Sequence, residues 1–324
     1  MTIYLNKKFE NKILTWKNLY KKLSAIAAVS GGQDSMCLVK FTEELNKKNN
    51  YFKQVEYIYI DHQWRSDCEH HIKHLLNYLN RKDCKISVYQ INNNYFSELT
   101  ARRIRYHIIV NHALNNQQQI VLTGHNQTDQ TETFFLNLIR GAGMEGITSL
   151  NFNRKLANHL TLLRPLIKFK RSDISWFYRR FCLPIWSDET NFKYKNSRNR
   201  IRNELLPYLS QYFGLQTDNN ISHFLNSAFL DSEYIKQNSI KLYIISRHKN
   251  YIAINFWIIK SQHKALQTRV LQIFFYHHFN SPLSRKILNQ IIKYVQTQNS
   301  RKKKKVILWR NLTINIEKNW LYVR

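Results

Sequence analysis

The chain has 324 residues, enough for two ordinary domains, and its 43% hydrophobic content excludes an intrinsically disordered protein. Lysine and arginine outnumber aspartate and glutamate by 50 to 21, and the resulting formal charge of +29 favours a nucleic-acid partner. AT-rich coding drift is the alternative source of the lysines, and it fits the scarcity of glycine (7) and proline (4). No apolar run approaches the about 18 residues of a membrane span, so we expect a soluble protein without a membrane partner.

The four cysteines are scattered, with no C-x-x-C pair and no histidine spacing that suggests zinc, so we expect free thiols in a reducing compartment. Residues 1–24 lack the apolar core of a signal peptide, and the first expected strand begins too near Met1 to leave much room for a cleaved transit peptide. The richness in Lys, Asn and Ile fits a plastid genome or a reduced bacterium. We expect a plastid-encoded protein of the stroma, with the bacterial cytoplasm as the alternative; a homodimer is left open.

Short apolar segments predict strands at residues 25–29, 55–60, 86–91, 120–123 and 160–163. Between them, apolar residues at helical spacing predict helices at residues 36–45, 66–79, 101–114 and 131–138, and Ser66-Asp67-Cys68-Glu69 is typical of a capping box. This alternation predicts an α/β fold, with a parallel sheet covered by helices. Such sheets place their functional loops at the carboxyl ends of the strands. Residues 30–35, Asp61-His62 and Gly124-His125 all follow expected strands.

The pattern changes near residue 210, after Asn203-Glu204-Leu205-Leu206-Pro207 and before the polar residues 216–220. Beyond this point we expect helices at residues 221–242, 264–279 and 284–298, then a basic run at 301–305. The alternating segments 306–309 and 312–316 predict a small terminal hairpin. We therefore expect a parallel-sheet domain over residues 1–212 and a smaller, mainly helical domain over residues 213–324.

A glycine-rich loop, Ser30-Gly31-Gly32-Gln33-Asp34-Ser35, connects the first expected strand to the following helix. Two glycines let the backbone turn tightly, so that the loop amides and the helix N-terminus point at one spot, as phosphate binding requires. Ser30 and Ser35 add hydroxyl donors, while Asp34 is placed either to hold Mg2+ or to fix the loop. The alternative is an ordinary strand-to-helix turn. No Gly-Lys-Ser/Thr follows, so the loop is not a Walker A motif.

This loop resembles the PP-loop of ATP pyrophosphatases, and further motifs stand in the order seen in tRNA(Ile)-lysidine synthases. Those motifs are Asp61-His62-Gln63-Trp64-Arg65, Glu98 with Ala101-Arg102-Arg103-Ile104-Arg105-Tyr106, Gly124-His125, Asp129-Gln130-Thr131-Glu132-Thr133, Asn137-Leu138-Ile139-Arg140-Gly141-Ala142-Gly143, Arg164-Pro165-Leu166, Asp188-Glu189-Thr190-Asn191 and Arg198-Asn199-Arg200-Ile201-Arg202-Asn203-Glu204-Leu205-Leu206-Pro207. The resemblance spans residues 24–210. From Gln216 onward it is a general likeness to the helical tRNA-binding domain of the short family members.

The resemblance implies lysidine formation at the wobble cytidine of a CAU-anticodon tRNA(Ile), which changes decoding from AUG to AUA. ATP adenylates O2 of the cytosine, and L-lysine then displaces AMP from C2. The resemblance assigns ATP binding to Ser30, Gly31, Gly32, Gln33, Asp34, Ser35, Asp61, His62 and Gly124, with Mg2+ at Asp34. In this context we expect Asp34, His125, Asp129 and Glu132 to serve catalysis, and we interpret Arg102, Arg105, Arg140, Arg198 and Arg202 as contacts with ATP and the tRNA backbone.

The residue types suit that chemistry. Asp129 and Glu132 stand three residues apart at the start of an expected helix, so they face the same side of it. They are our choice for binding lysine and for accepting its proton. The alternative is that they are acids placed favourably at a helix N-terminus. His125 either orients the adenylated base or serves the fold. Guanidinium groups suit phosphates, although each of the five arginines is alternatively a solvated or ion-paired side chain.

One position departs from the family's pattern. Family members usually show two adjacent aspartates where this chain has Thr128-Asp129, so one carboxylate is absent, and Thr128 is suited to cap the helix instead. A PP-loop tRNA thiolase is the second candidate, but thiolation generally needs a cysteine pair or a cysteine-bound cluster, and no cysteines here are spaced for it. A non-catalytic RNA-binding protein is the third candidate, and the intact loop argues against it.

Overall fold

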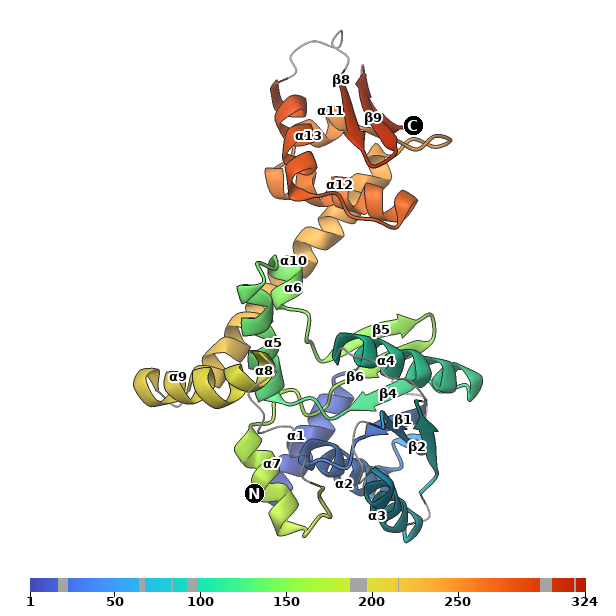
Figure 1. Ribbon diagram of the computed structural model, residues 1–324, viewed down its shortest axis with the longest axis vertical. Helices are drawn as coiled ribbons and strands as arrows, with labels where there is room; N and C mark the ends of the chain where they lie inside the picture. The colour runs from blue at the N-terminus through green and yellow to red at the C-terminus, as the bar shows by residue number, and fades with distance from the viewer. Residues whose placement is uncertain are drawn as a thin grey trace. The chain divides into compact units, whose positions relative to one another are not determined.

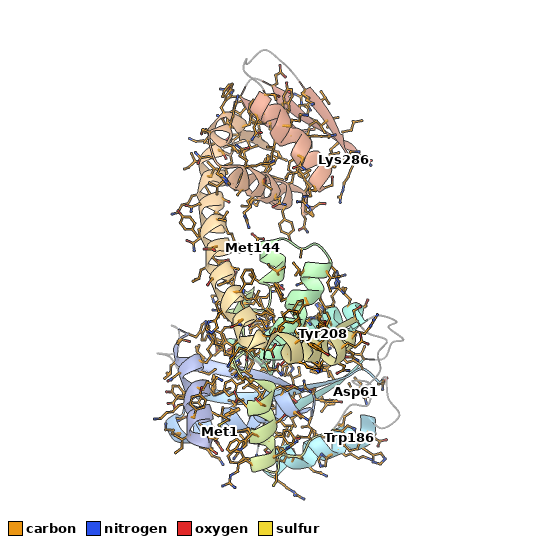
Figure 2. The ribbon with its side chains drawn as sticks, turned by 90° about the vertical axis from the view of Figure 1, so that its left-hand side faces the viewer. Met1, Asp61, Met144, Trp186, Tyr208 and Lys286 are labelled. Carbon is orange, nitrogen blue, oxygen red and sulfur yellow. The ribbon has the colours of Figure 1, made fainter. Side chains whose placement is uncertain are left out.

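The computed structural model describes residues 1–16, 23–63, 68–82, 84–91, 98–186, 197–214, 216–297, 305–317 and 319–324 (Figures 1 and 2). Trp64-Arg65, the expected capping box at Ser66-Asp67, residues 188–191 and the basic residues 301–304 lie outside this part of the chain. The chain divides into two compact units, Met1–Leu225 and Asn226–Arg324. The division falls inside helix α10 (Thr217–Ser246) and not after residue 212, because this helix continues unbroken past the polar segment.

The first unit is built on a six-stranded sheet that confirms the expected α/β fold. Its order is β3 (Ile86–Gln90), β2 (Phe52–Asp61), β1 (Leu23–Val29), β4 (Ile120–Thr123), β6 (Leu160–Leu163) and β5 (Asn153–Ala157). Neighbouring strands are parallel except β5, an unexpected edge strand that runs antiparallel to β6. The strand order reverses between β1 and β4, and ligands bind at such a switch point in open α/β sheets.

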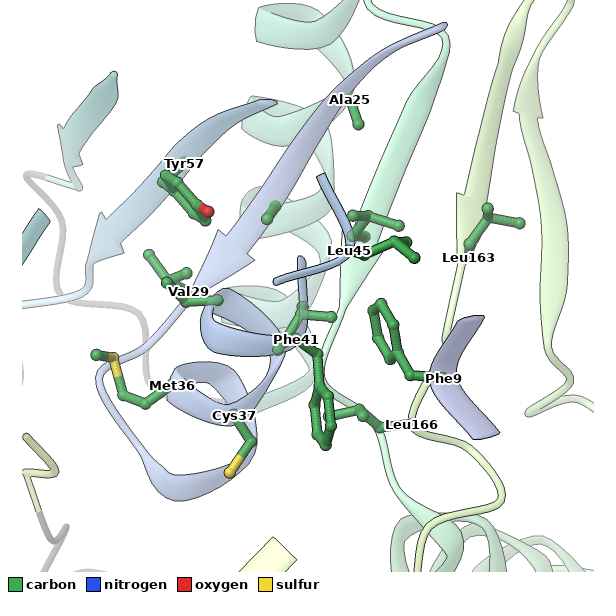
Figure 3. Packing of buried hydrophobic residues seen from close by; sticks show 14 of the residues in the cluster. Phe9, Ala25, Val29, Met36, Cys37, Phe41, Leu45, Tyr57, Leu163 and Leu166 are labelled. Carbon is green, nitrogen blue, oxygen red and sulfur yellow. The ribbon is translucent and has the colours of Figure 1, made fainter. Parts of the chain in front are cut away.

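Helices cover both faces of this sheet. On one face, α1 (Thr2–Leu14), α2 (Gln33–Asn49), α3 (Cys68–Asn80) and α7 (Arg171–Arg180) contribute to a large hydrophobic core. Phe41 of α2 lies at its centre (Figure 3), with its ring centroid 5.1 Å from that of Phe9 and 3.8 Å from that of Phe177. On the other face, Ile109 and Ala113 of α4 (Glu98–Asn115) pack on apolar strand residues.

The first unit also contains α5 (Gln127–Ile139) and four short helical segments, three of which contact α5. The four segments are α6 (Met144–Ile147), α8 (Ser197–Arg200), the π-helical turn η2 (Ile201–Leu205) and α9 (Leu206–Phe213). The π turn has a local cause: Pro207 has no amide hydrogen to pair with the Asn203 carbonyl, so the regular helical ladder cannot continue there. Wide turns of this kind occur frequently at functional sites.

The second unit combines helices with a small antiparallel sheet. Its helices are the remainder of α10, α11 (Phe256–Lys260), α12 (Lys264–Phe279) and α13 (Arg285–Thr297). The sheet order is β7 (Ala253–Asn255), β10 (Trp320–Val323), β9 (Leu312–Glu317) and β8 (Lys305–Trp309), so the expected terminal hairpin is half of a four-stranded sheet. Phe275 and Trp309 meet edge to face in its core, with centroids 4.9 Å apart. Across the described ranges, no helix combines the length and apolar character needed to cross a membrane.

Candidate active site

The glycine-rich loop lies between the end of β1 and the start of α2, as expected from the sequence. Gly31 adopts φ +73°, a left-handed conformation that glycine allows, and Gly32 is the N-cap of α2. The Ser35 hydroxyl donates to the Gly32 carbonyl at 2.9 Å, and the Ser30 hydroxyl donates to Ser35 Oγ at 3.3 Å. This geometry turns the loop amides and the amino end of α2 toward one spot, which suits a phosphate group.

Gly124 brings the end of β4 against this loop. A Cβ atom at Gly124 would lie 3.1 Å from the carbonyl carbon and oxygen of Asp34 and 3.2 Å from the Ser35 nitrogen. These neighbours are backbone atoms at the start of α2, which have little freedom to move. A further contact comes from Trp186, whose amide donates to the Gly31 carbonyl at 3.1 Å. The close approach of β4 and the loop therefore leaves little room for a side chain at position 124.

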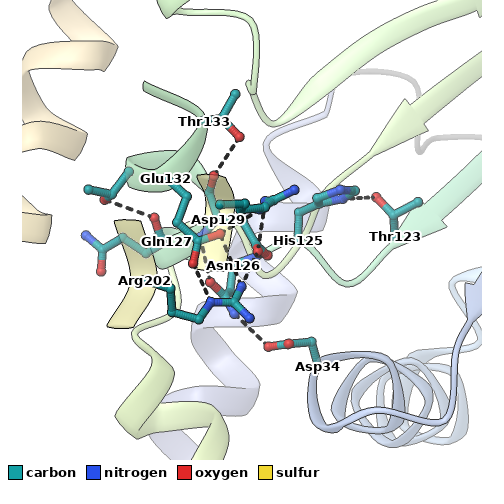
Figure 4. A network of polar contacts seen from close by, with 11 residues as sticks. Asp34, Thr123, His125, Asn126, Gln127, Asp129, Glu132, Thr133 and Arg202 are labelled. Atoms are coloured by element: carbon teal, nitrogen blue, oxygen red, sulfur yellow. Dashed lines mark hydrogen bonds and ion pairs between the residues drawn. The ribbon is translucent and has the colours of Figure 1, made fainter. Parts of the chain in front are cut away.

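Asn126 joins the phosphate loop to α5 (Figure 4). Its buried side chain donates from Nδ2 to Asp34 Oδ1 at 2.7 Å and accepts the Asp129 amide at 3.0 Å. Asp129 Oδ2 in turn accepts the Asn126 amide at 2.9 Å, which completes a capping box. The expectation that Thr128 caps this helix is wrong, because Asn126 is the N-cap and Thr128 is buried within the first turn.

Asp129 and Glu132 form ion pairs with Arg198 and Arg202; we call these residues the carboxylate–arginine cluster. Glu132 Oε2 accepts from Arg198 Nε at 2.7 Å and from Arg202 Nη2 at 3.1 Å, and Glu132 Oε1 accepts from Arg202 Nε. Asp129 Oδ1 lies 3.2 Å from Arg198 Nη2 and 3.4 Å from Arg202 Nη2. The two acids therefore face one side of α5, as expected, and the two arginines are ion-paired.

The cluster is closely packed, and its formal charges cancel. Glu132 is fully buried, while Arg198 and Arg202 keep about a fifth of their side chains exposed, 22% and 21%. Burial lowers the pKa of the Arg202 guanidinium, but its hydrogen bonds and ion pairs with Glu132 and Asp129 more than compensate and raise it. Buried charges are tolerated only when they are paired in this way.

The pKa values of Asp34 and Asp129 are shifted in opposite directions. Burial and the charge of Asp129 raise the pKa of Asp34 to about 6, against the hydrogen bond from Asn126 that lowers it. Burial alone would also raise the pKa of Asp129, but the positive charges of Arg198 and Arg202 and the hydrogen bond from the Asn126 amide outweigh it, so that pKa lies below its usual range. Near neutral pH both aspartates are therefore ionised, and Asp34 is the one that is readily protonated.

His125 follows Gly124 and is held by a hydrogen bond between its Nδ1 and Thr123 Oγ1 at 3.0 Å. His125 is half-buried. Burial lowers its pKa to about 3, and the positive charges of Arg164 and Arg102 act in the same direction, so the imidazole is neutral at physiological pH. Arg164 is itself buried, and its Nη1 donates to the Asn151 carbonyl at 2.7 Å.

Asp61 and His62 lie at the end of β2, beside the strand that leads to the phosphate loop. The buried Asp61 carboxylate accepts the Gln63 amide at 2.8 Å, so it stabilises its own turn. His62 is half-buried, and burial together with the charge of Arg105 lowers its pKa. Their part in binding ATP stays a prediction.

The remaining arginines of the predicted set are exposed. Arg102 and Arg105 lie on α4, where Cζ of Arg102 is 5.6 Å from the Tyr106 ring centroid, and Arg140 ends α5. Two of the five arginines, Arg198 and Arg202, thus belong to the cluster, and the other three are exposed. Asn126 was missed from the sequence, although asparagine three residues before an aspartate at a helix start is a capping-box signal.

In the described ranges, no group of three or more His, Cys, Asp or Glu residues is placed to hold a metal ion without the help of a substrate. Asp34 and Asp129 are near enough to influence each other's charge, but Asp129 is engaged by its capping box and by arginines. A single carboxylate with substrate phosphates is a common way to bind Mg2+. Asp34 fits that arrangement.

The fold and the loop define the class of protein: residues 5–209 match the family model of the PP-loop domain. The chloroplastic tRNA(Ile)-lysidine synthase of Gracilaria tenuistipitata var. liui is 54% identical over 321 residues, which cover 99% of this chain and 99% of that protein. The one of Pyropia yezoensis is 34% identical over 322 residues, 99% of this chain and 95% of that protein. The chain therefore belongs to the tRNA(Ile)-lysidine synthase family of PP-loop proteins.

A solved structure supports the fold assignment independently. The U34-tRNA thiolase NcsA from Methanococcus maripaludis aligns with a TM-score of 0.59 over 70% of this chain and 80% of that chain. The sequence identity is 14%, so the likeness concerns the fold alone. It shows that the two proteins share a fold over this part of the chain.

Proposed function

We propose that the protein ligates L-lysine to C2 of the wobble cytidine in CAU-anticodon tRNA(Ile), through an adenylated intermediate. The observation that carries the proposal is the direct link from Asp34 in the phosphate loop, through Asn126, to the helix that bears Asp129 and Glu132. An ATP site and a carboxylate pair are thus held together at one switch point. The family name supports tRNA(Ile) as one substrate of such a site, and L-lysine is our proposal for the other.

The phosphate loop would bind the triphosphate of ATP, with Ser30, Ser35 and the loop amides around the departing pyrophosphate. Asp34 would share a Mg2+ ion with the phosphates, and this ion would offset the negative charge that develops there. The pKa of about 6 at Asp34 fits this role, because a buried carboxylate without a cation is costly to ionise. Cytosine O2 attacks the α-phosphorus, and the bond to the pyrophosphate oxygen breaks.

The carboxylate pair would hold the amine of lysine for the second step. The amine attacks C2, the C2–O2 bond breaks, AMP leaves with that oxygen, and the amine proton passes to a carboxylate. In the structure both acids are neutralised by Arg198 and Arg202. Lysine must therefore share these carboxylates with a guanidinium group or replace one, and a released arginine would suit the AMP phosphate.

Thiolation is disfavoured by the cysteines that the structure describes. Cys37 lies in α2 beside the loop, but it is buried, and its thiol donates to the Ile174 carbonyl at 3.7 Å. Burial, together with the nearby Asp34 charge, raises the pKa of this thiol, so it is a poor nucleophile. Cys84 is half-buried and Cys182 is exposed at the end of α7.

We place the protein in a plastid, because both full-length relatives are chloroplastic enzymes. Within the plastid we propose the stroma, where its tRNA would take part in translation.

The test is direct. Purified protein is incubated with ATP, lysine and CAU-anticodon tRNA(Ile), and the digested nucleosides are analysed by mass spectrometry. We expect one cytidine to gain the mass of a lysyl group with release of AMP, and no gain when lysine is omitted. A thiolated base, or no change beside an active control enzyme, would refute the proposal.

A further inference from the structure

An open groove of about 620 Å³ lies next to the carboxylate–arginine cluster, between the end of α5 and the segment from α8 to α9. Its lining is largely apolar, with guanidinium groups and one aromatic ring at the edge. The lining residues are Leu136, Ile139, Arg140, Ser197, Arg200, Ile201, Glu204, Leu205 and Tyr208. The mechanism above uses none of them.

The exposed rings and cations at this groove suit an unpaired RNA base. Tyr208 is 55% exposed and projects from α9 (Figure 2), with its ring centroid 4.7 Å from that of Tyr212. Arg140 and Arg200 are exposed at the same groove. Exposed aromatic rings beside arginines form stacking platforms for single-stranded nucleic acid, because every base has a flat face and every nucleotide a phosphate.

The groove is also close enough to the cluster to act on the same RNA. Glu132, Leu136 and Arg140 are spaced four residues apart on α5, so they follow one face of the helix in steps of about 6 Å. On the opposite wall, Arg198 and Arg202 reach the cluster, while Arg200 and Ile201, from the same segment, line the groove. A nucleotide next to the reacting cytidine can therefore reach this groove.

We infer that the groove binds one unpaired base of the anticodon loop, adjacent to the wobble cytidine, by stacking on Tyr208 with its phosphate near Arg140. The inference rests on the proposed function and adds a subsite to it. Glu204 lies 3.3 Å from Arg200 and partly neutralises it, so the phosphate belongs on the Arg140 side. The charge of +29 makes RNA a better match for these cations than a second copy of the chain.

The test measures binding of the full-length protein to CAU anticodon stem-loops, each with an abasic site at one loop position. One abasic position should weaken binding about tenfold, as expected for the loss of one stacked base. Tyr208→Ala should weaken binding of the intact loop by a similar factor and cause no further loss with that abasic loop. Tyr208→Phe keeps the ring and should bind as wild type.

Two controls separate stacking from general effects. Tyr4→Ala removes a ring of similar exposure, 59%, from α1 and should leave binding unchanged. Arg140→Gln should weaken all loops equally and reduce the slope of log K against log salt concentration by about 0.7, as expected for one phosphate contact.

The outcomes are distinguishable from failure of the proposed function. If wild-type protein binds the loop but Tyr208→Ala stays within twofold of it, the groove assignment is wrong. The groove assignment would also be wrong if Tyr208→Ala weakened binding of every abasic loop as much as it weakens binding of the intact loop. A change in oligomeric state with RNA affinity unchanged would also overturn it, since that outcome makes the groove a protein interface. Failure of wild type to bind any loop would instead refute the proposed function.

Discussion

The carboxylate–arginine cluster makes a quantitative prediction for the variant Glu132→Gln. Glutamine keeps the size of the side chain and removes the charge that Arg198 and Arg202 share. Breaking a buried ion pair by removing one partner costs about 3–5 kcal/mol in free energy of unfolding. The side chains of Arg198 and Arg202 are about one-fifth exposed, 22% and 21%, and Asp129 remains beside them, so we expect a smaller loss of about 2–3 kcal/mol.

The assay is thermal unfolding, followed by circular dichroism. The cluster lies in the unit Met1–Leu225, and for a unit of this size each 1 kcal/mol shifts the melting temperature by about 2–4 °C. We therefore expect the transition of this unit to fall by about 4–12 °C. Glu69→Gln is the matched control, because Glu69 makes an exposed pair with Lys73 that should contribute nothing measurable.

A second measurement tests the reasoning itself. If the loss comes from leaving two guanidinium groups underpaired, the double variant Glu132→Gln with Arg198→Gln should be less destabilised than the sum of the single variants. Additive losses, or a melting temperature of Glu132→Gln equal to that of Glu69→Gln, would refute a stabilising ion-pair cluster. In the enzymatic assay, Glu132→Gln should keep tRNA-dependent ATP–pyrophosphate exchange and lose transfer to lysine.

Two further predictions concern the phosphate loop. Gly124→Ala places a methyl group against the Asp34 and Ser35 backbone and should weaken ATP binding at least tenfold, as measured by calorimetry. Gly143→Ala is the control, because a Cβ atom at Gly143 meets open space, and it should bind ATP as wild type does. Equal ATP affinities of the two variants would contradict the packing argument. Asp34→Asn should abolish AMP release while leaving tRNA binding intact. Because its folded pKa is raised from 3.8 to about 6, ionised Asp34 destabilises the fold, and stability is lost as pH rises from about 4 to about 6. Denaturant unfolding should therefore show Asp34→Asn to be more stable than wild type by up to about 3 kcal/mol at pH 7.5, with no gain below pH 4; an equal gain at both pH values would contradict this.

Local patterns and one topology rule were sufficient to predict the centre of the site. The phosphate loop and Gly124 each follow a short apolar strand, and the carboxyl ends of parallel strands meet at one edge of a sheet, so the sequence places them together. The shared face of Asp129 and Glu132 follows in the same way from helical spacing alone. These predictions depend on residues that are close along the chain.

Long-range pairing was not predictable in this way. The hydrogen bond from Asn126 to Asp34 spans 92 positions, and the ion pairs of Glu132 with Arg198 and Arg202 span 66 and 70. Nothing local distinguishes these two arginines from the exposed Arg102 or Arg140. Strand β7 has three residues, too few for an alternating pattern to be recognised. Helix α1 did carry a signal, since Leu5, Phe9 and Ile13 recur every four residues and are buried.

The π turn at Ile201–Leu205 has a consequence for the geometry of the whole arginine-bearing segment. A wide turn accommodates one residue more than an α-helical turn, so it acts as a one-residue insertion in the helix. It therefore determines the direction in which the side chains after it point around the helix axis. Deleting Asn203 would shorten this turn by one residue and rotate α9 by about 100° relative to α8. Arg198 would still face Glu132, but Tyr208 would turn away from the groove. The single wide turn thus keeps Arg198, which pairs with Glu132, and the groove-lining Tyr208 in phase along one segment.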